Sequence, residues 1–148
     1  MSGSSLNIKQ KKSLSLREER DRAVFEAYNQ AITQNDFKSQ DEACKYVRKM
    51  KAPRFYVSPE FCGIVIGRML RGEPTGVDGE ASKRKFNELF RRYLAYQSVG
   101  EKATLISICY NIVYEEAPEF YLSTRSIRYI IFKEKERQCE ELRRRVYR

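Results

Sequence analysis

A seven-residue segment occurs twice in the chain, and no other sequence feature constrains the fold as much. Ala52–Ser58 reads APRFYVS, and Ala117–Ser123 reads APEFYLS, a shift of 65 positions (117 − 52). The same shift aligns other aromatic, thiol and aliphatic residues without a gap: Phe25 with Phe90, Tyr28 with Tyr93, Cys44 with Cys109, Val47 with Ile112 and Val65 with Ile130. The chain is therefore predicted to contain two copies of a unit of roughly fifty residues.

Within each copy, apolar residues recur at three- and four-residue steps, which is typical of one face of a helix. The first copy is predicted to form three helices, which begin near Arg17, Ser39 and Pro59. Ser39 and Glu42 have the spacing of a capping box, and Ser58 provides a cap before proline at the first helical position. The residues expected to face inward include Ile32, Phe61 and Leu94.

The second copy repeats this plan. Ser98 and Glu101 predict another capping box at the start of its second helix, and Ser123 is the expected cap of its third helix. No stop signal follows Lys133, so the third helix is expected to continue to about Val146.

Strand signals are confined to the two short connectors, so the predicted fold class is all-α. The expected organisation is a mobile basic arm (1–16), a first three-helix unit (17–71), a linker (72–85) and a second three-helix unit with a C-terminal helical extension (86–148). The two units are expected to lie back to back.

The residue inventory argues against most catalytic and metal-binding chemistry. The sequence has no histidine, which removes the commonest general base and a common zinc ligand. Glycine-loop, nucleophile-elbow and dinucleotide motifs are missing, and no two of the four cysteines have CxxC spacing. We predict that the protein is not an enzyme, that it binds no metal, cofactor or small-molecule substrate, and that its cysteines are buried as small hydrophobic residues.

The longest apolar run, Phe61–Ile66, is far too short to span a bilayer. Charged residues make up 33% of the chain, and no signal peptide is visible. These features predict a cytoplasmic protein with no membrane partner.

The net charge of +9 is unevenly distributed. Residues 1–20 and 137–148 carry +3 each, whereas residues 72–136 sum to zero. Basic ends around a folded body fit an electrostatic footprint for nucleic acid, and ordinary solubilising charge is the alternative. The terminal cations expected to supply affinity are Lys9, Lys11, Lys12, Arg143, Arg144 and Arg145.

The segment Leu122–Ile131 reads LSTRSIRYII: a hydrophobic residue and a serine precede a polar turn, and a β-branched residue follows. This pattern resembles the start of the recognition helix in helix-turn-helix DNA-binding proteins. The resemblance implies that Thr124, Arg125 and Arg128 face outward and contact base edges in the major groove. Lys133, further along the same helix, is grouped with them as a DNA contact.

Two features depart from the helix-turn-helix pattern. The connector Lys51–Val57 is about twice as long as the usual turn of three or four residues, which is long enough to swing the third helix away from the groove. The first copy also carries Pro59, Glu60 and Gly63 where the second carries the outward polar residues. We therefore expect the second copy to contact DNA and the first to serve as a scaffold.

The connectors differ in the sign of their charges. Lys51 aligns with Glu116, and Arg54 aligns with Glu119. Inverted charges on a duplicated surface suit a contact either between the two copies or between neighbouring chains. Drift of exposed residues is the alternative.

The repeated aromatic pair on each connector, Phe55-Tyr56 and Phe120-Tyr121, is expected to anchor the third helix by burial. Stacking on nucleic-acid bases is the functional alternative.

These features together predict a non-enzymatic DNA-binding protein, acting as a regulator or as a DNA-packaging or recombination adaptor, built from tandem helix-turn-helix-like units. Duplex DNA is the expected partner, with self-association through the oppositely charged connectors. The alternative is a helical protein–protein interaction or assembly module with basic tails.

Overall fold

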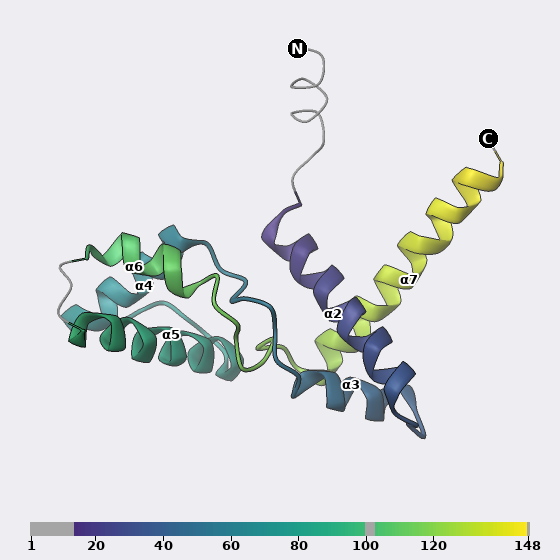
Figure 1. The fold of residues 1–148 in the computed structure, drawn as a ribbon, viewed down its shortest axis with the longest axis horizontal. Helices are drawn as coiled ribbons and strands as arrows, with labels where there is room; N and C mark the ends of the chain where they lie inside the picture. Colours follow the sequence, from purple (N-terminus) through teal and green to yellow (C-terminus); the bar gives the residue numbers. More distant parts are fainter. Residues whose placement is uncertain (1–13, 100–102, 148) are drawn as a thin grey trace, which may run out of the picture.

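A computed structural model describes residues 14–99 and 103–147. This part of the chain folds into six helices (Figure 1), and none of them is long and apolar enough to cross a membrane. In chain order the helices are α2 (Leu16–Gln34), α3 (Gln40–Arg48), α4 (Pro59–Arg71), α5 (Glu80–Ser98), α6 (Leu105–Ile112) and α7 (Thr124–Val146). The predicted all-α class is confirmed, and so is a long last helix.

Short polar side chains begin most of these helices. Ser15, Ser39, Ser58, Thr104 and Ser123 each accept a hydrogen bond from a backbone N–H three residues further on. This contact satisfies one of the N–H groups that the first turn of a helix leaves without an intrahelical partner. The expected caps at residues 39, 58 and 123 are therefore confirmed, but the capping box is not, because the Glu42 carboxylate accepts from the Lys38 N–H instead of the Ser39 N–H.

Three predicted boundaries need correction. α5 begins at Glu80, so the linker is residues 72–79 rather than 72–85, because residues 80–85 are mostly good helix formers. Ser98 ends α5 instead of capping the next helix, and Thr104 caps α6; Glu101 lies outside the described residues. Ser15 caps α2 within the segment expected to be a mobile arm, and residues 1–13 are not described.

The third helices of the two copies are exchanged. α7 packs on α2 and α3, and α4 packs on α5 and α6, so each third helix completes the helix pair of the other copy. We call α2, α3 and α7 lobe one, and α4, α5 and α6 lobe two; they lie on opposite sides of Figure 1. The packed groups therefore differ from the contiguous units 17–71 and 86–148 expected from the sequence. The duplication as the origin of the two copies remains a prediction.

Two connectors cross between the lobes and explain the exchange. The N–H of Ala52 donates to the carbonyl oxygen of Ala117, and the N–H of Ala117 donates to that of Ala52, each at 2.9 Å. This antiparallel bridge holds the connectors side by side. Pro53 and Pro118 bias the two alanines towards an extended backbone. Each connector therefore carries its third helix across to the far helix pair instead of folding it back.

Aromatic side chains anchor the crossing. Phe55 and Phe120 are 1% and 5% exposed. The Phe55 ring stacks on Tyr121 of the other connector, with ring centroids 6.0 Å apart. The Phe55 N–H also donates to the carbonyl oxygen of Val113 at 3.0 Å. Burial of the two phenylalanines agrees with their expected role as anchors.

Arg92 of α5 fastens the second connector. Its guanidinium lies 4.8 Å from the Phe55 ring centroid and donates to a Glu115 carboxylate oxygen and to the Glu116 carbonyl oxygen. It also pairs with Glu88, which binds Arg91 as well. Hydrogen bonds from Arg91, together with those from Arg92, lower the pKa of Glu88 to about 2 despite partial burial. The carboxylate is therefore held ionised between two guanidinium groups.

The charged connector residues contact different partners from those expected. Lys51 does meet Glu116, with its ammonium 3.7 Å from a carboxylate oxygen, and both side chains are exposed. Arg54 does not meet Glu119. It pairs with Glu19 of α2 at 3.5 Å, and Glu119 pairs with Arg84 of α5 at 3.0 Å.

These last two ion pairs are equivalent in the repeat, because Glu19 and Arg84 are also 65 positions apart. The connector residue is Arg54 in the first copy and Glu119 in the second. Its partner on the helix changes from Glu19 to Arg84, so each pair keeps opposite charges. The inversion is thus compensated within each copy, and of the two predicted contacts between copies only the one between Lys51 and Glu116 is present.

Reversing Arg54 to Glu is expected to destabilise the fold by about 2 kcal/mol, because Arg54 is largely buried and also donates to the carbonyl oxygens of Phe55 and Val57. Adding Glu19→Arg recreates the pairing found at Glu119 and Arg84, and should recover part of the loss. Urea denaturation of the two single variants and the double variant measures this coupling. Strictly additive effects would contradict the compensation.

The buried residues of both lobes and of the connectors form one continuous core. It contains Cys44, Cys62 and Cys109; Cys62 is hydrogen-bonded to Cys109, which together with burial raises the pKa of Cys62.

Four residues that were expected to face inward are exposed instead: Ile32, Phe61, Leu94 and Cys139. Phe61 instead meets the Phe86 ring edge-on at the border of the core. Ile32 follows Ala31, the last buried residue of α2, and Cys139 lies on the part of α7 beyond the lobe.

Candidate nucleic-acid interface

α7 presents a basic face because its three isoleucines turn inward, while two aromatic residues, Tyr129 and Phe132, lie exposed beside the cations. Ser123 fixes the start of the helix, and its hydroxyl accepts from the Ser126 N–H at 3.1 Å. Ile127, Ile130 and Ile131 then pack against α2 and α3. The opposite side carries Arg125, Arg128, Tyr129, Phe132 and Lys133, which are all exposed, and Thr124 is half-buried at the helix start.

The two arginines predicted to contact bases differ in their surroundings. The Arg128 guanidinium donates to a carboxylate oxygen of Asp41 in α3 at 3.0 Å. Asp41 also pairs with Lys45 at 3.3 Å, which leaves this patch with a net positive charge. Arg125 has no side-chain partner among the described residues. Arg125 is therefore ready to bind an anion, whereas Arg128 must first release Asp41.

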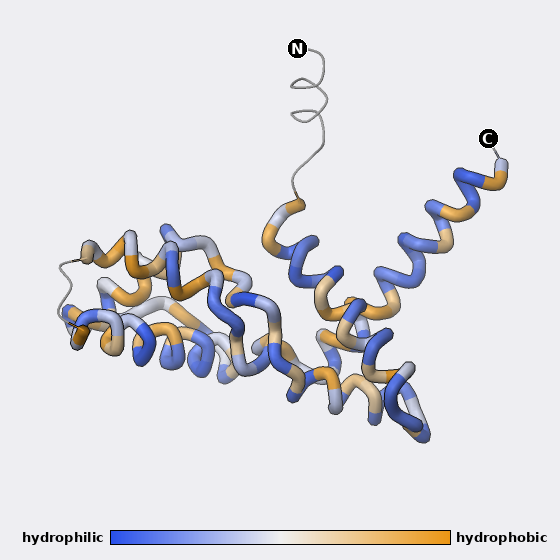
Figure 2. Tube along the Cα trace, in the orientation of Figure 1, coloured by the Kyte–Doolittle hydropathy of each residue, from blue (hydrophilic) through white to orange (hydrophobic). Residues whose placement is uncertain are grey.

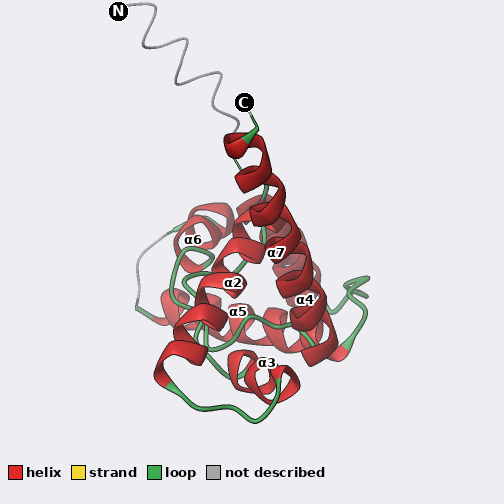
Figure 3. Cartoon of the chain, turned by 90° about the vertical axis from the view of Figure 1, so that its right-hand side faces the viewer, coloured by secondary structure: helices red, strands yellow, loops and turns green. Residues whose placement is uncertain are grey.

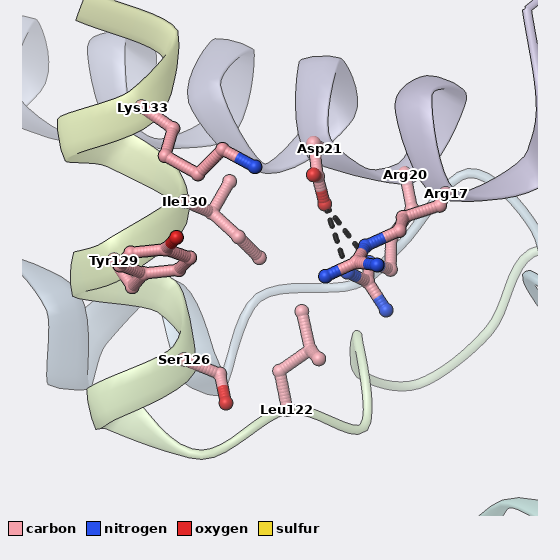
Figure 4. Close-up of a pocket in the computed structure, with 8 residues that line it drawn as sticks. All are labelled: Arg17, Arg20, Asp21, Leu122, Ser126, Tyr129, Ile130 and Lys133. Carbon is pink, nitrogen blue, oxygen red and sulfur yellow. Dashed lines mark hydrogen bonds and ion pairs between the residues drawn. The ribbon is translucent and has the colours of Figure 1, made fainter.

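A small cavity of about 160 Å³ lies between α2 and α7. Figure 4 shows Lys133 reaching across it from α7, while Arg17, Arg20 and Asp21 line it from α2. Arg20 is paired with Asp21 at 2.9 Å, and the Lys133 ammonium lies 5.5 Å from the Tyr129 ring centroid. Three cations and one carboxylate leave a net positive charge, which suits a phosphate group.

Sequence analysis missed several residues of this surface. Arg17 and Arg20 belong to α2, which was expected to be a scaffold, and they reach the site only because α7 is exchanged onto α2. Tyr129, Phe132 and Lys135 have the helical spacing of Arg125 and could have been found from it. The ammonium of Lys135 lies 5.4 Å from the ring centroid of Tyr28.

The remaining predicted cations lie away from this surface or outside the description. Arg143, Arg144 and Arg145 are exposed near the far end of α7, where Arg145 pairs with Glu141 at 3.2 Å. They share one continuous helix with the basic face. Lys9, Lys11 and Lys12 lie outside the described residues.

The equivalent surface of lobe two has the opposite character. At positions shifted by 65, Glu60 replaces Arg125, Gly63 replaces Arg128 and Leu70 replaces Lys135. A shallow groove between α4 and α6 is lined mainly by apolar atoms of Gly63, Ile64, Gly67, Leu105 and Ile106, and Glu60, Arg68 and Arg71 line it as well. In Figure 2 the α6 region is largely orange, whereas the outer half of α7 is mostly blue.

The chain matches no protein-family model, no curated protein sequence and no solved structure. The candidate function therefore rests on the geometry of its own residues.

Proposed function

We propose that the protein is a non-enzymatic nucleic-acid-binding protein that engages duplex DNA through the outward face of α7. One observation carries the proposal: the outward face of α7 carries Arg125, Arg128 and Lys135 where the equivalent face of α4 carries Glu60, Gly63 and Leu70, although Arg68 of α4 aligns with Lys133. Solubilising charge alone gives no reason for three cations on one face where the equivalent face has a carboxylate, a glycine and a leucine.

The arrangement divides into two kinds of contact. Arg125 and Arg128, near the start of α7, are placed to contact base edges, as in the recognition helix that the segment resembles. Arg17, Arg20 and Lys133 around the cavity are placed to contact a backbone phosphate. The unit differs from a helix-turn-helix in connectivity, because the helix that packs on α3 arrives from the other copy.

Fluorescence anisotropy with duplex DNA, single-stranded DNA and RNA at several salt concentrations tests the proposal. We expect duplex DNA to bind most tightly, with an affinity that falls steeply with salt. Lys133→Ala should lower the slope of log affinity against log salt by about one, and Arg125→Ala should reduce sequence preference. Arg71→Ala, which removes an exposed cation from lobe two, is the matched control.

Asp41 allows a second, opposite test. Asp41→Asn removes the carboxylate that holds Arg128, so the variant should bind DNA more tightly, whereas Arg128→Ala should bind less tightly. The proposal fails if the parent protein binds no nucleic acid, or if the lobe-one variants and the lobe-two control lose affinity equally.

The apolar groove of lobe two favours a second candidate, a helical interaction module that docks another protein there. Exposed Ile64 and Ile106 line this groove. Gly63 and Gly67 also line it, and because they have no side chains, α4 projects no atoms beyond its backbone at these two positions. This function would be favoured if DNA binding were absent and Ile64→Glu abolished binding to a purified protein partner.

A further inference from the structure

The last part of α7 extends beyond both lobes. The final buried positions of the helix are Ile131 and Glu134, and every described residue from 138 to 147 is exposed. Figures 1 and 3 both show this segment projecting away from the other helices. α4 has no counterpart to it, because α4 ends at Arg71, which aligns with Glu136. The extension is therefore an addition to the lobe and not needed to complete it.

The extension carries an apolar stripe. Phe132, Cys139, Leu142 and Val146 follow one another at steps of seven, three and four residues, which are the a and d positions of a heptad pattern. Leu142 is 57% exposed and Val146 is 72% exposed. Lys135 occupies the remaining d position; its ammonium lies 5.4 Å from the ring centroid of Tyr28, and the aliphatic stem of a lysine can cover apolar surface at such a position.

We infer that the outer half of α7 pairs with the same segment of a second copy in an antiparallel arrangement. A two-fold axis between residues 140 and 141 places Cys139 against Leu142 of the second copy, and Val146 against the stem of Lys135. Beside this seam, Glu136 lies opposite Arg143 of the second copy, and the symmetry repeats the pair. Neither residue has a side-chain partner elsewhere in the described chain.

Charge selects this orientation over the parallel one. A parallel pair would place Lys135 against Lys135 of the second copy at the centre of the seam, and it would leave Glu136 and Arg143 apart. The antiparallel pair removes the like-charge contact and adds two opposite-charge contacts. Because each extension projects away from its own lobes, the two bodies lie at opposite ends of the pair.

The seam is only about two heptads long, so the dimer should be weak and should depend on protein concentration. Sedimentation equilibrium of the full chain over a wide concentration range measures this, and we expect a shift from monomer to dimer. The variant with Leu142→Glu and Val146→Glu should remain monomeric throughout. Arg144→Glu changes the net charge by the same amount on the opposite side of the helix and should leave the dimer intact.

Two further sets of variants test the orientation. Glu136→Arg and Arg143→Glu should each weaken the dimer at least several-fold, and the combined variant should restore it. Under mild oxidation, Leu142→Cys should form covalent dimers through Cys139 and the new cysteine, identified by peptide mapping. A variant that combines Leu142→Cys with Cys139→Ser should form few covalent dimers under the same conditions.

The inference does not depend on nucleic-acid binding. It is overturned if the parent chain is monomeric at all concentrations, or if the variant with Leu142→Glu and Val146→Glu dimerises as the parent does. Efficient disulfide formation between the two native Cys139 side chains would replace the antiparallel arrangement with a parallel one.

Discussion

Two halves of the chain, 1–75 and 76–148, are expected to be unfolded when separate and to fold together when mixed. Each half carries a third helix that belongs to the other half's helix pair. Without α5 and α6, the inward face of α4 at Cys62, Val65 and Ile66 has nothing to cover it. Far-ultraviolet circular dichroism of each half and of their mixture, followed by gel filtration, measures the effect.

The matched control is the intact chain nicked within the linker 72–79, which has the same break but has already folded. It should melt cooperatively, like the mixture of halves. A half that folds alone as a monomer with a cooperative melt would contradict the exchange of helices, and would support two contiguous three-helix units instead.

Phe55→Ala and Phe120→Ala should each destabilise the protein by about 3–5 kcal/mol, because each removes a buried ring from the crossing of the connectors. Phe132→Ala is the control, since it removes an exposed ring from α7 and should change stability by about 0.5 kcal/mol or less. Denaturant unfolding gives these values. If Phe55→Ala were as stable as the parent but bound nucleic acid poorly, the aromatic motif would serve base stacking.

The helices were largely predictable from the sequence, and their partners were not. Apolar spacing located the helices, and serine caps located three of the six starts, because both signals act within a few residues. The exchange left no such signal. The two copies bury equivalent faces, with Val65 of α4 and Ile130 of α7 both buried, so apolar spacing alone does not tell which helix pair each one covers. The backbone of the connectors decides between the two.

The residues of the candidate site also fall into those that the sequence could predict and those that it could not. Arg125 and Arg128 could be assigned because they follow a capped helix start in a recognisable pattern. Arg17 and Arg20 could not, since they reach the site only through the packing of α7 on α2. The partner of Arg54 was available from the repeat, because the shift that aligns Arg54 with Glu119 also aligns Glu19 with Arg84.

The crossed connectors also link the two faces of the molecule mechanically. The basic face lies on α7, which follows the connector that contains Ala117, and the apolar groove lies partly on α4, which follows the connector that contains Ala52. Two backbone hydrogen bonds join those alanines, both almost fully buried. A displacement of α7 that moves its connector would therefore also act on the connector that leads to α4, so a ligand bound at one face could alter the other through this pair of hydrogen bonds.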